Sequence, residues 1–313
     1  MITLTKDQIE PLFDFARATS AIEQAYRDTS RGLVNLPPVG HITFPESADC
    51  HIKYGHVQGA ANFVIKIATG MPENAAVGLP SGNGLSLVLS AKTGAVQAIL
   101  HDEMMLTDLR TGIGGAIATR ALARKDAQNI LVVGTSIQAH QQILAHRAVL
   151  GDRSAFTIWG RDAAKARALA LQQACDATTD LQAACVRADV IVTATGATTA
   201  LIHSDWVRPG THITAVGADA PGKQELDPNL VAWAHILVAD LTAQCLDHGE
   251  ISHAYQAGLI ARDKPIELGH LLDDPNLGRQ TQAQITIADL TGIAAQDIAI
   301  AQVILAAHQR ETA

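Results

Sequence analysis

The chain has 313 residues, of which 48% are hydrophobic and 17% charged, and its formal net charge is −8 at pH 7. This length suits two domains rather than a single core, and the composition is that of a folded globular protein rather than a disordered one. An acidic chain without a basic run is a poor partner for nucleic acid or an anionic membrane surface. We therefore expect neither partner.

Targeting and cysteine patterns point to a reducing compartment. No segment has the run of about 18 apolar residues that a membrane span requires, and the first residues lack the pattern of a signal peptide. The four cysteines, Cys50, Cys175, Cys185 and Cys245, are scattered and show no C-x-x-C spacing. We expect free thiols, no metal site and a cytoplasmic location.

The N-terminal third mixes helical and extended patterns. Apolar spacing predicts one helix from Lys6 to Arg31, and Gly32 is a suitable residue to end it. Thr107 is the predicted N-cap of a later helix that runs to about Ala123. Between these helices, apolar runs bounded by turn residues predict strands at Cys50–Tyr54, Asn62–Ala68, Leu85–Ser90 and Ala95–Leu100.

From Asn129 onward, short apolar strands alternate with helices. Strands are expected at Asn129–Gly134, Ala155–Gly160, Val190–Ala194, His212–Val216 and His235–Ala239. Such alternation predicts an α/β fold with a Rossmann-type, doubly wound parallel sheet. The strand, turn and Ala-rich helix after Ile285 are expected to return to the first domain. The predicted domains are a discontinuous α+β domain (1–115 and 290–313) and a Rossmann-type dinucleotide-binding domain (116–289).

A glycine turn follows the first of these strands. The sequence G-T-S-I-Q-A at Gly134–Ala139 matches a dinucleotide-binding fingerprint, except that its middle glycine is Ser136. An ordinary strand-to-helix turn is the alternative interpretation. If the fingerprint is functional, the cofactor is NAD(P), held by Gly134, Thr135, Ser136, Ile137, Gln138 and Ala139.

In such a fold, the residues after the second strand indicate whether the cofactor is NAD or NADP. NAD enzymes usually carry an acidic residue there, which binds the ribose 2′-hydroxyl group. This chain has Gly160 and Arg161 there, followed by Asp162. Arg161 suits a 2′-phosphate and favours NADP over NAD, whereas Asp162 is equally the natural N-cap of the next helix.

The combination and order of several further motifs resemble the ornithine cyclodeaminase/mu-crystallin family over nearly the full length. The resemblance implies a homodimer whose first domain pairs through a mixed sheet and binds substrate, while a Rossmann domain binds NAD(P). The motifs are V-I-K at Val64–Lys66, M-P-E-N at Met71–Asn74, L-T-D-L-R-T at Leu106–Thr111, V-G-A-D-A-P-G-K-Q-E-L-D at Val216–Asp227 and G-E-I at Gly249–Ile251.

Matching the family's functional residues assigns roles here. Lys66 and Asp219 are the implied catalytic residues, and Lys66 and Arg110 the implied substrate-binding residues. Arg110 suits a substrate carboxylate, because its planar group donates two parallel hydrogen bonds. Asp219 follows a predicted strand and suits a proton donor, while Lys66 can pair with the substrate or with Asp219. Thr111 and Thr195 are expected to contact the cofactor as well.

Two places need a separate interpretation. Many family members carry an arginine after the early Pro-rich loop, and this chain has none near His41. Lys53 on the next predicted strand can supply that positive charge to the substrate; a surface position for both residues is the alternative. The polar group Lys223, Glu225 and Asp227 is expected to be a solvated loop or hinge.

Three functions fit these motifs. The first is an NAD(P)H-dependent oxidoreductase acting on C–N bonds, a reductase of small imino acids such as pyrroline-2-carboxylate or an amino acid dehydrogenase. The second is an NAD-dependent ornithine cyclodeaminase, a lyase that converts ornithine to proline and uses the same residues. The third is a non-catalytic, crystallin-like binding protein, which Ser136 keeps open.

Overall fold

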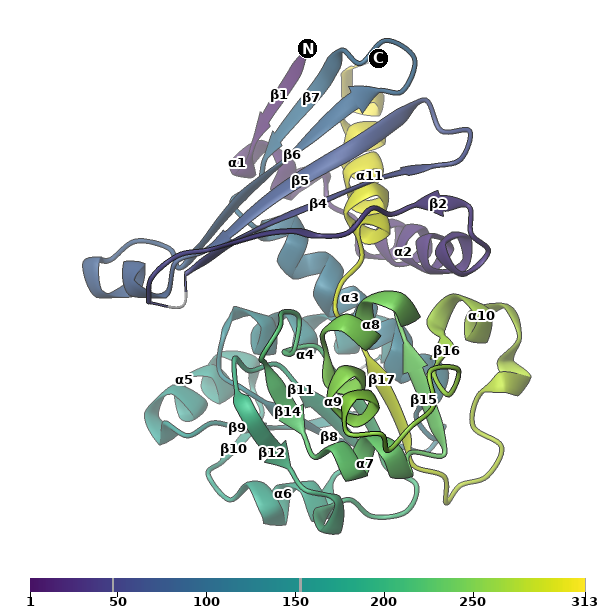
Figure 1. The fold of residues 1–313 in the computed structure, drawn as a ribbon. Coiled ribbons are helices and arrows are strands. Elements are labelled where there is room, and N and C mark those ends of the chain that lie inside the picture. The colour runs from purple at the N-terminus through teal and green to yellow at the C-terminus, as the bar shows by residue number, and fades with distance from the viewer. Residues whose placement is uncertain (47, 152–153, 313) are drawn as a thin grey trace. The chain divides into compact units, whose positions relative to one another are not determined.

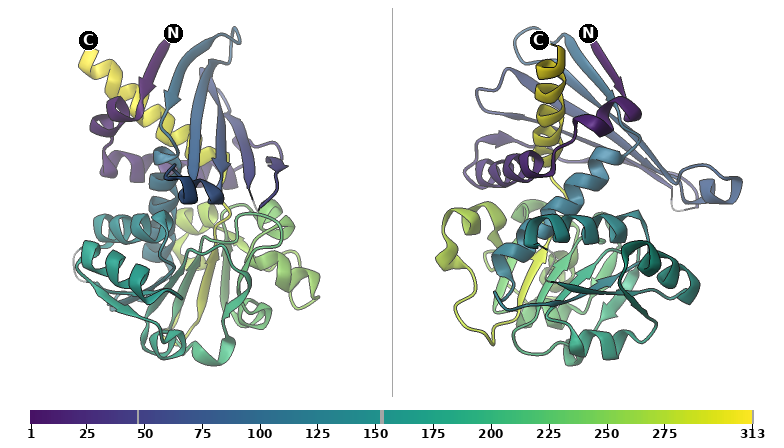
Figure 2. Two further views of the ribbon diagram at one scale, coloured as in Figure 1. Left: turned by 90° about the vertical axis from the view of Figure 1, so that its left-hand side faces the viewer. Right: turned by 180° about the vertical axis from the view of Figure 1, so that it is seen from behind.

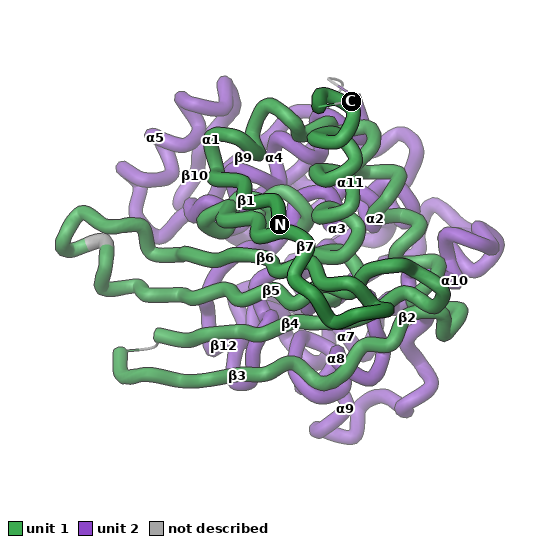
Figure 3. Tube along the Cα trace, turned by 90° about the horizontal axis from the view of Figure 1, so that it is seen from above, with its two compact units in different colours: residues 1–110, 293–313 green, residues 111–292 purple. Residues whose placement is uncertain are grey.

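The structure is a computed structural model that describes residues 1–46, 48–151 and 154–312. The chain divides into two compact units, drawn in different colours in Figure 3. Unit 1 consists of Met1–Arg110 and Ile293–Ala313, and unit 2 of Thr111–Gly292. The C-terminal segment thus belongs to the N-terminal unit, and the division near residue 110 falls inside a helix, α3 (Met105–Leu122).

Unit 1 contains a mixed sheet. Its strands β4, β5, β6 and β7 form an antiparallel meander, and β1 adds to β7 in parallel. The short strands β2 and β3 both pair with β4. The strands are β1 (Ile2–Thr5), β2 (Val34–Asn35), β3 (Gly40–Thr43), β4 (Asp49–Val57), β5 (Asn62–Gly70), β6 (Gly82–Ser90) and β7 (Val96–His101).

Two long helices cover one face of this sheet, as Figures 1 and 2 show: α2 (Phe15–Ser30) and α11 (Ala294–Thr312). The core between the sheet and these helices is built from sheet side chains, including Val64, Val88 and Leu100, and from Ile304 of α11. On the same face, Lys66 lies two residues after Val64 along β5. The face therefore changes from apolar to charged along the strand.

The predicted single helix at Lys6–Arg31 is wrong. The structure has α1 (Lys6–Ile9), a short 3-10 helix η1 (Glu10–Leu12) and then α2. Pro11 cannot donate a helical hydrogen bond. Asp14 then caps α2 by accepting a hydrogen bond from the backbone N–H of Arg17 at 3.0 Å.

The predicted cap of α3 is also wrong. The helix begins at Met105, so Thr107 lies inside it. The cap comes from Asp102 instead, whose carboxylate accepts a hydrogen bond from the backbone N–H of Leu106 at 2.8 Å. Burial raises the pKa of Asp102 to about 6.

Unit 2 is built on a parallel sheet of eight strands in the order β10-β9-β8-β11-β13-β17-β15-β16. This is the doubly wound, Rossmann-type arrangement that the alternating pattern predicts. The strands are β8 (Asn129–Val133), β9 (Ala155–Trp159), β10 (Asp176–Thr178), β11 (Val190–Thr193), β13 (His212–Ala215), β15 (Ile236–Ala239), β16 (Ile266–Glu267) and β17 (Thr286–Asp289). Strands β12 (Thr198–Ile202) and β14 (Gln224–Leu226) form a separate pair.

Both faces of this sheet are buried. Along β8, Ile130 and Val132 join one apolar cluster, while Leu131 and Val133 join the other. The helices of the unit after α3 are α4 (Ile137–Leu150), α5 (Ala163–Gln173), α6 (Leu181–Arg187), α7 (Pro228–Trp233), α8 (Thr242–Asp247), α9 (Glu250–Gln256) and α10 (Leu268–Asp273). Within the described residues, no helix combines the length and apolarity needed to cross a membrane. All four cysteines are free.

Candidate active site

The candidate site residues fall into two groups, one in each unit. In unit 2 they surround a cavity of about 570 Å³. The cavity lies at the carboxyl ends of β8, β9, β11 and β13. Here the strand order reverses, because β9 lies on one side of β8 and β11 on the other. Doubly wound sheets bind their ligands at this crossover. Predicted residues that line it are Gly134, Thr135, Ser136, Gln138, Gly160, Arg161, Thr195 and Asp219.

Three predicted cofactor residues lie elsewhere in the part of unit 2 that the structure describes. Ala139 is a buried residue of α4, Ile137 is exposed in the first turn of that helix, and Thr111 is on α3. The carbonyl oxygen of Thr111 accepts a hydrogen bond from the side chain of Gln142. Ala139 supports the turn by packing rather than by lining the cavity.

The turn after β8 explains the fingerprint and its departure. Gly134 has a φ of +135°, and a Cβ atom there would lie 2.6 Å from the carbonyl oxygen of Ala194. Glycine is therefore required at this close approach. Ser136 is the N-cap residue of α4, and its hydroxyl donates to the same Ala194 oxygen at 3.4 Å. The serine is thus accommodated beside β11, and the N-terminus of α4 offers backbone N–H groups suited to a pyrophosphate.

The two residues that compete for cofactor choice have separate positions. Asp162 is the N-cap of α5, and its carboxylate accepts hydrogen bonds from the backbone N–H groups of Ala164 and Lys165. These bonds lower the pKa of Asp162. Arg161 is exposed and lines the cavity. The cationic side chain is therefore the one presented to a ligand.

Asp219 lies four residues beyond the end of β13 and also lines the cavity. Its carboxylate accepts a hydrogen bond from Lys223 Nζ at 2.6 Å. Lys223 lines the same cavity. The expectation that Lys223 belongs to a solvated loop is therefore incomplete, because it orients the implied catalytic carboxylate.

The prediction of a solvated loop is wrong for Glu225, since its side chain is fully buried. Its two carboxylate oxygens accept hydrogen bonds from the backbone N–H groups of Thr195, at 2.6 Å, and Gly217, at 3.0 Å. Both residues line the cavity, so Glu225 holds two of its walls together. Burial raises the pKa of Glu225 to about 7. Asp227, the third member, caps α7.

In unit 1, two predicted substrate-binding residues meet around the carboxylate of Asp297, which no sequence motif indicates. Asp297 Oδ1 lies 3.1 Å from Arg110 Nε and 3.5 Å from Lys66 Nζ, and all three side chains are buried. Gln296 accepts a further hydrogen bond from Arg110 at 3.3 Å. Asp297 stands out in sequence as a charge in the otherwise apolar, Ala-rich start of α11.

Charge and burial oppose each other in this cluster. Burial lowers the pKa of Lys66, although Asp297 acts in the opposite direction. Burial alone would raise the pKa of Asp297, but neighbouring cations, Arg110 first, outweigh it and hold that pKa below its usual value. The cluster is therefore a preformed set of cationic donors around an ionised carboxylate, an arrangement that suits an anionic ligand.

Lys53 joins the same region. In the antiparallel register of β4 and β5 it lies directly opposite Lys66, and its side chain is buried as well. Its positive charge helps to lower the pKa of Asp297. Lys53 is thus part of the cationic cluster rather than a surface residue, whereas His41 on β3 is exposed.

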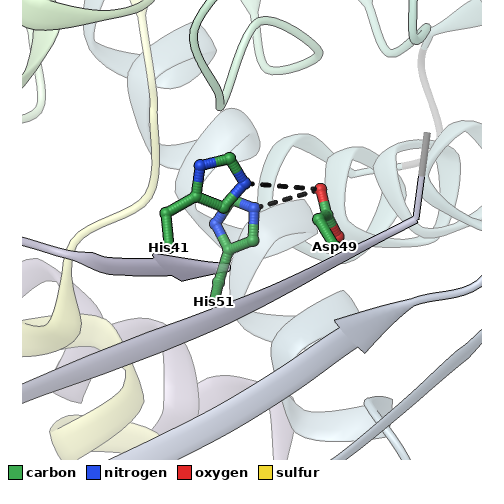
Figure 4. A group of neighbouring side chains, drawn as sticks. All are labelled: His41, Asp49 and His51. Atoms are coloured by element: carbon green, nitrogen blue, oxygen red, sulfur yellow. Dashed lines mark hydrogen bonds and ion pairs between the residues drawn. The ribbon is translucent and has the colours of Figure 1, made fainter. Parts of the chain in front are cut away.

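A third polar group lies at the start of β4 and on the neighbouring strand β3. His41, Asp49 and His51 place one ligand atom each within 4.8 Å of one another (Figure 4). The Nε2 atoms of His51 and His41 lie 3.2 and 3.9 Å from one oxygen of Asp49. Within the described residues, this is the one set of three such side chains with spacing suited to a divalent cation.

Known proteins are similar to this chain in sequence and fold. A profile of the ornithine cyclodeaminase/mu-crystallin family matches residues 1–311. An uncharacterised cyclodeaminase of Sinorhizobium fredii is 40% identical over 94% of this chain and 91% of its own length. An iminosuccinate reductase of Paracoccus denitrificans is 33% identical over 99% and 98%. A Δ1-pyrroline-2-carboxylate reductase of the same organism is 33% identical over 74% and 75%.

Solved structures agree with these matches. An archaeal alanine dehydrogenase dimer with bound NAD superposes with a TM-score of 0.89 at 30% identity, covering 100% of this chain and 97% of the other. The Paracoccus denitrificans iminosuccinate reductase with NAD⁺ gives a TM-score of 0.88 at 29% identity, covering 100% and 97%. The match extends over both units, and the chain belongs to the ornithine cyclodeaminase/mu-crystallin family.

Proposed function

We propose that this chain is an NAD(P)H-dependent oxidoreductase that reduces the C=N bond of small imino acids and, in reverse, dehydrogenates amino acids. The observation that carries the proposal is the buried cluster of Lys66, Arg110 and Asp297 in unit 1. Relatives named for imine reduction and amino acid dehydrogenation support it. Each unit supplies one part of the chemistry.

Unit 2 supplies the dinucleotide site. Its cavity combines the glycine turn after β8, the N-terminus of α4 and the loops braced by Glu225. These features fit a pyrophosphate and the two nucleosides that it joins. Gly134, Thr135, Ser136 and Gln138 would contact the phosphates, and Thr195 the adjoining part. Bound NAD(P)H supplies the hydride that reduces the imine carbon.

Cofactor choice rests on Arg161. A guanidinium group that faces the cavity favours a 2′-phosphate, while the nearby carboxylate of Asp162 is already bonded to α5. This supports a preference for NADP over NAD. The two solved relatives were determined with NAD or NAD⁺.

Unit 1 supplies the hold on the substrate. Arg110 and Lys66 donate hydrogen bonds to the carboxylate next to the reacting carbon, and Lys53 adds a third cation. Fixing that carboxylate orients the C=N bond and removes much of the entropic cost of reaction. Asp297 keeps the two donors in place before the substrate binds.

Asp219 supplies or retains the proton on the imine nitrogen of the substrate. An imine accepts hydride readily only when its nitrogen is protonated, and a positioned carboxyl group supplies or retains that proton. Lys223 orients the Asp219 carboxylate for this role. We further propose a homodimer, because the archaeal relative is described as a dimer. The cytoplasmic location stays a prediction from sequence.

The test follows the absorbance of reduced nicotinamide. Purified protein is mixed with NADPH or NADH and with Δ1-pyrroline-2-carboxylate or a 2-oxo acid plus ammonium. A parallel assay measures ammonia released from L-ornithine with NAD. Cofactor consumption without ammonia release is the expected result. Ammonia release without net cofactor change identifies an ornithine cyclodeaminase instead, and failure to bind either dinucleotide identifies a non-catalytic binding protein.

A further inference from the structure

Two histidines and an aspartate converge on one face of the β3–β4 hairpin. His41 and His51 are direct partners in the antiparallel register of the two strands, so their side chains leave the same face of the sheet. Asp49 lies two residues before His51 on β4 and therefore shares that face. Figure 4 shows the two rings and the carboxylate turned toward one another. The register thus brings three metal-ligating side chains together from two strands.

The distances between the ligand atoms fit a tetrahedral metal ion. The Nε2 atoms of His51 and His41 lie 3.2 and 3.9 Å from Oδ2 of Asp49. In a tetrahedral site with bonds of about 2.0–2.2 Å to imidazole nitrogen and carboxylate oxygen, neighbouring ligand atoms lie about 3.3–3.5 Å apart. The pair formed by His51 and Asp49 is already close to this spacing. His41, which is exposed, reaches it by a small rotation of its side chain.

The neighbouring strand leaves space for the carboxylate of Asp49. Gly70 on β5 is the register partner of Asp49, and a Cβ atom at Gly70 would lie 2.7 Å from Asp49 Oδ1. A larger residue at this position would displace that oxygen, whereas glycine lets it approach the backbone. Asp49 therefore places Oδ1 over β5 and Oδ2 toward the two histidines. This is a second observation that supports a site, because it fixes which oxygen the rings meet.

The three side chains are accessible from solvent. The exposed fraction is 28% for His41, 26% for Asp49 and 14% for His51, so an ion can reach them without opening the hairpin. Water can then fill a fourth position, as in zinc sites with three protein ligands. Two imidazoles with one carboxylate favour Zn²⁺ and its first-row neighbours over Mg²⁺ and Ca²⁺, which prefer oxygen ligands alone.

We propose that His41, Asp49 and His51 bind a divalent transition metal ion of the Zn²⁺ class, with water in the fourth position. The ion joins β3 to β4 and adds metal–ligand bonds to the backbone pairing of this hairpin. This inference goes beyond the proposed function, since the site needs neither dinucleotide nor substrate. It also departs from the expectation that the chain has no metal site. No short sequence motif links His41 to the other two ligands, and only the hairpin register brings the three together.

Metal titration of the whole chain tests the site. Protein stripped of metal is titrated with Zn²⁺ against a chromophoric chelator, and with Co²⁺, whose visible absorption reports tetrahedral coordination. We expect one tightly bound ion per chain and no thiolate-to-cobalt charge-transfer band, because no cysteine is a ligand. His51→Gln and Asp49→Asn should each weaken Zn²⁺ binding at least about 100-fold, since loss of a partner outside the ligand set already costs up to that much. His101→Gln, at an exposed histidine of β7, should leave both readings unchanged.

Thermal unfolding gives a second readout that does not depend on catalysis, since an ion that binds the folded state raises the midpoint. Zn²⁺ should raise it in wild type and in His101→Gln but not in His51→Gln or Asp49→Asn. Near-UV circular dichroism checks that the variants fold, and His41→Gln, at the most exposed ligand, repeats the test if either does not. Zn²⁺ binding that the ligand variants retain at wild-type affinity would show adventitious binding elsewhere and overturn the site. Failure of wild type to bind Zn²⁺ or Co²⁺ would overturn it too and leave a metal-free, hydrogen-bonded group.

Discussion

Unit 1 and unit 2 both bury charged side chains, but they stabilise them in different ways. In unit 1, Asp297 is surrounded by the side-chain cations Lys66 and Arg110, and its pKa is lowered. In unit 2, Glu225 and Asp289 accept hydrogen bonds from backbone N–H groups, and burial raises their pKa to about 7 and about 8. The arrangement in unit 1 favours the ionised form of the buried carboxylate, whereas the arrangement in unit 2 favours the protonated form of its buried acids.

This difference indicates two kinds of site construction. Under the proposed function the cations of unit 1 bind the substrate carboxylate directly, so their removal should reduce substrate affinity. The acids of unit 2 accept hydrogen bonds from backbone N–H groups, which for Glu225 belong to residues that line the cavity, so their removal should change stability more than chemistry. Asp219 and Arg161 are the test of this division, because they are ionisable side chains of unit 2 that line the cavity themselves.

The largest expected effect is that of Asp219→Ala. Loss of a positioned proton donor reduces rate by about 100- to 10,000-fold, and we expect kcat to fall about 1,000-fold within that range. Steady-state kinetics measures the loss, and equilibrium dinucleotide binding should change little. Asp263→Ala, an exposed acid in the same unit, serves as the control. Unchanged turnover in Asp219→Ala would remove this residue from the mechanism.

Arg110→Met should have the next largest effect. It removes charged hydrogen bonds worth about 3 kcal/mol, which corresponds to a loss of about 100-fold in kcat/KM. The loss should appear mainly as a higher KM for the imino acid, since Arg110 holds its carboxylate. Arg17→Met, at an exposed ion pair of the same unit, is the matched control. If dinucleotide affinity falls as much as substrate affinity, the assignment of separate roles to the two units is wrong.

These two variants address residues that the sequence indicated, but their partners were not predictable. The motif L-T-D-L-R-T pointed to Arg110, yet its partner Asp297 lies 187 positions away. Only the return of the C-terminal helix to unit 1 brings the two together. The burial of Glu225 is not predictable for a related reason. In a polar stretch of sequence, nothing distinguishes a solvated carboxylate from a buried one that accepts hydrogen bonds from backbone N–H groups.

The fold is more predictable from the sequence than the partners of the site residues. The apolar runs of unit 2 predicted its parallel strands, because strands covered on both faces need few polar residues. The errors fall at helix starts. Pro11 and Asp14 divide the expected first helix, and Asp102 rather than Thr107 caps α3. Both depend on which of several capping residues the tertiary structure selects.

Arg161→Ala should change cofactor choice without a large loss of activity. Removing a surface-exposed guanidinium from a 2′-phosphate weakens NADPH binding about tenfold, which corresponds to about 1.4 kcal/mol. The dissociation constant of NADH should change less than twofold. Fluorescence titration of the two cofactors gives the ratio, with Arg167→Ala on α5 as the control. A ratio that does not change would show that NADP preference, if present, does not depend on Arg161.

Glu225→Gln should affect activity least and stability in a pH-dependent way. Burial raises the pKa of this carboxyl from 4.5 to about 7. Between these values the unfolded chain loses the proton and the folded chain retains it, so the free energy of unfolding falls as pH rises. Denaturant titrations from pH 5 to pH 7 should show a decline that is smaller by about 2 kcal/mol in the variant. Equal slopes would mean that Glu225 is ionised in the folded protein.

The central claim is that this chain transfers hydride to the carbon of a C=N bond whose carboxylate is held by unit 1. It is tested most directly with NADPH or NADH that carries deuterium at the reactive position of the nicotinamide. Mass spectrometry and NMR of the amino acid product locate the label after incubation with an imino acid. The account predicts one deuterium at the α carbon in wild type and strongly reduced product in Arg110→Met. Product without label, or equal product from both proteins, would contradict it.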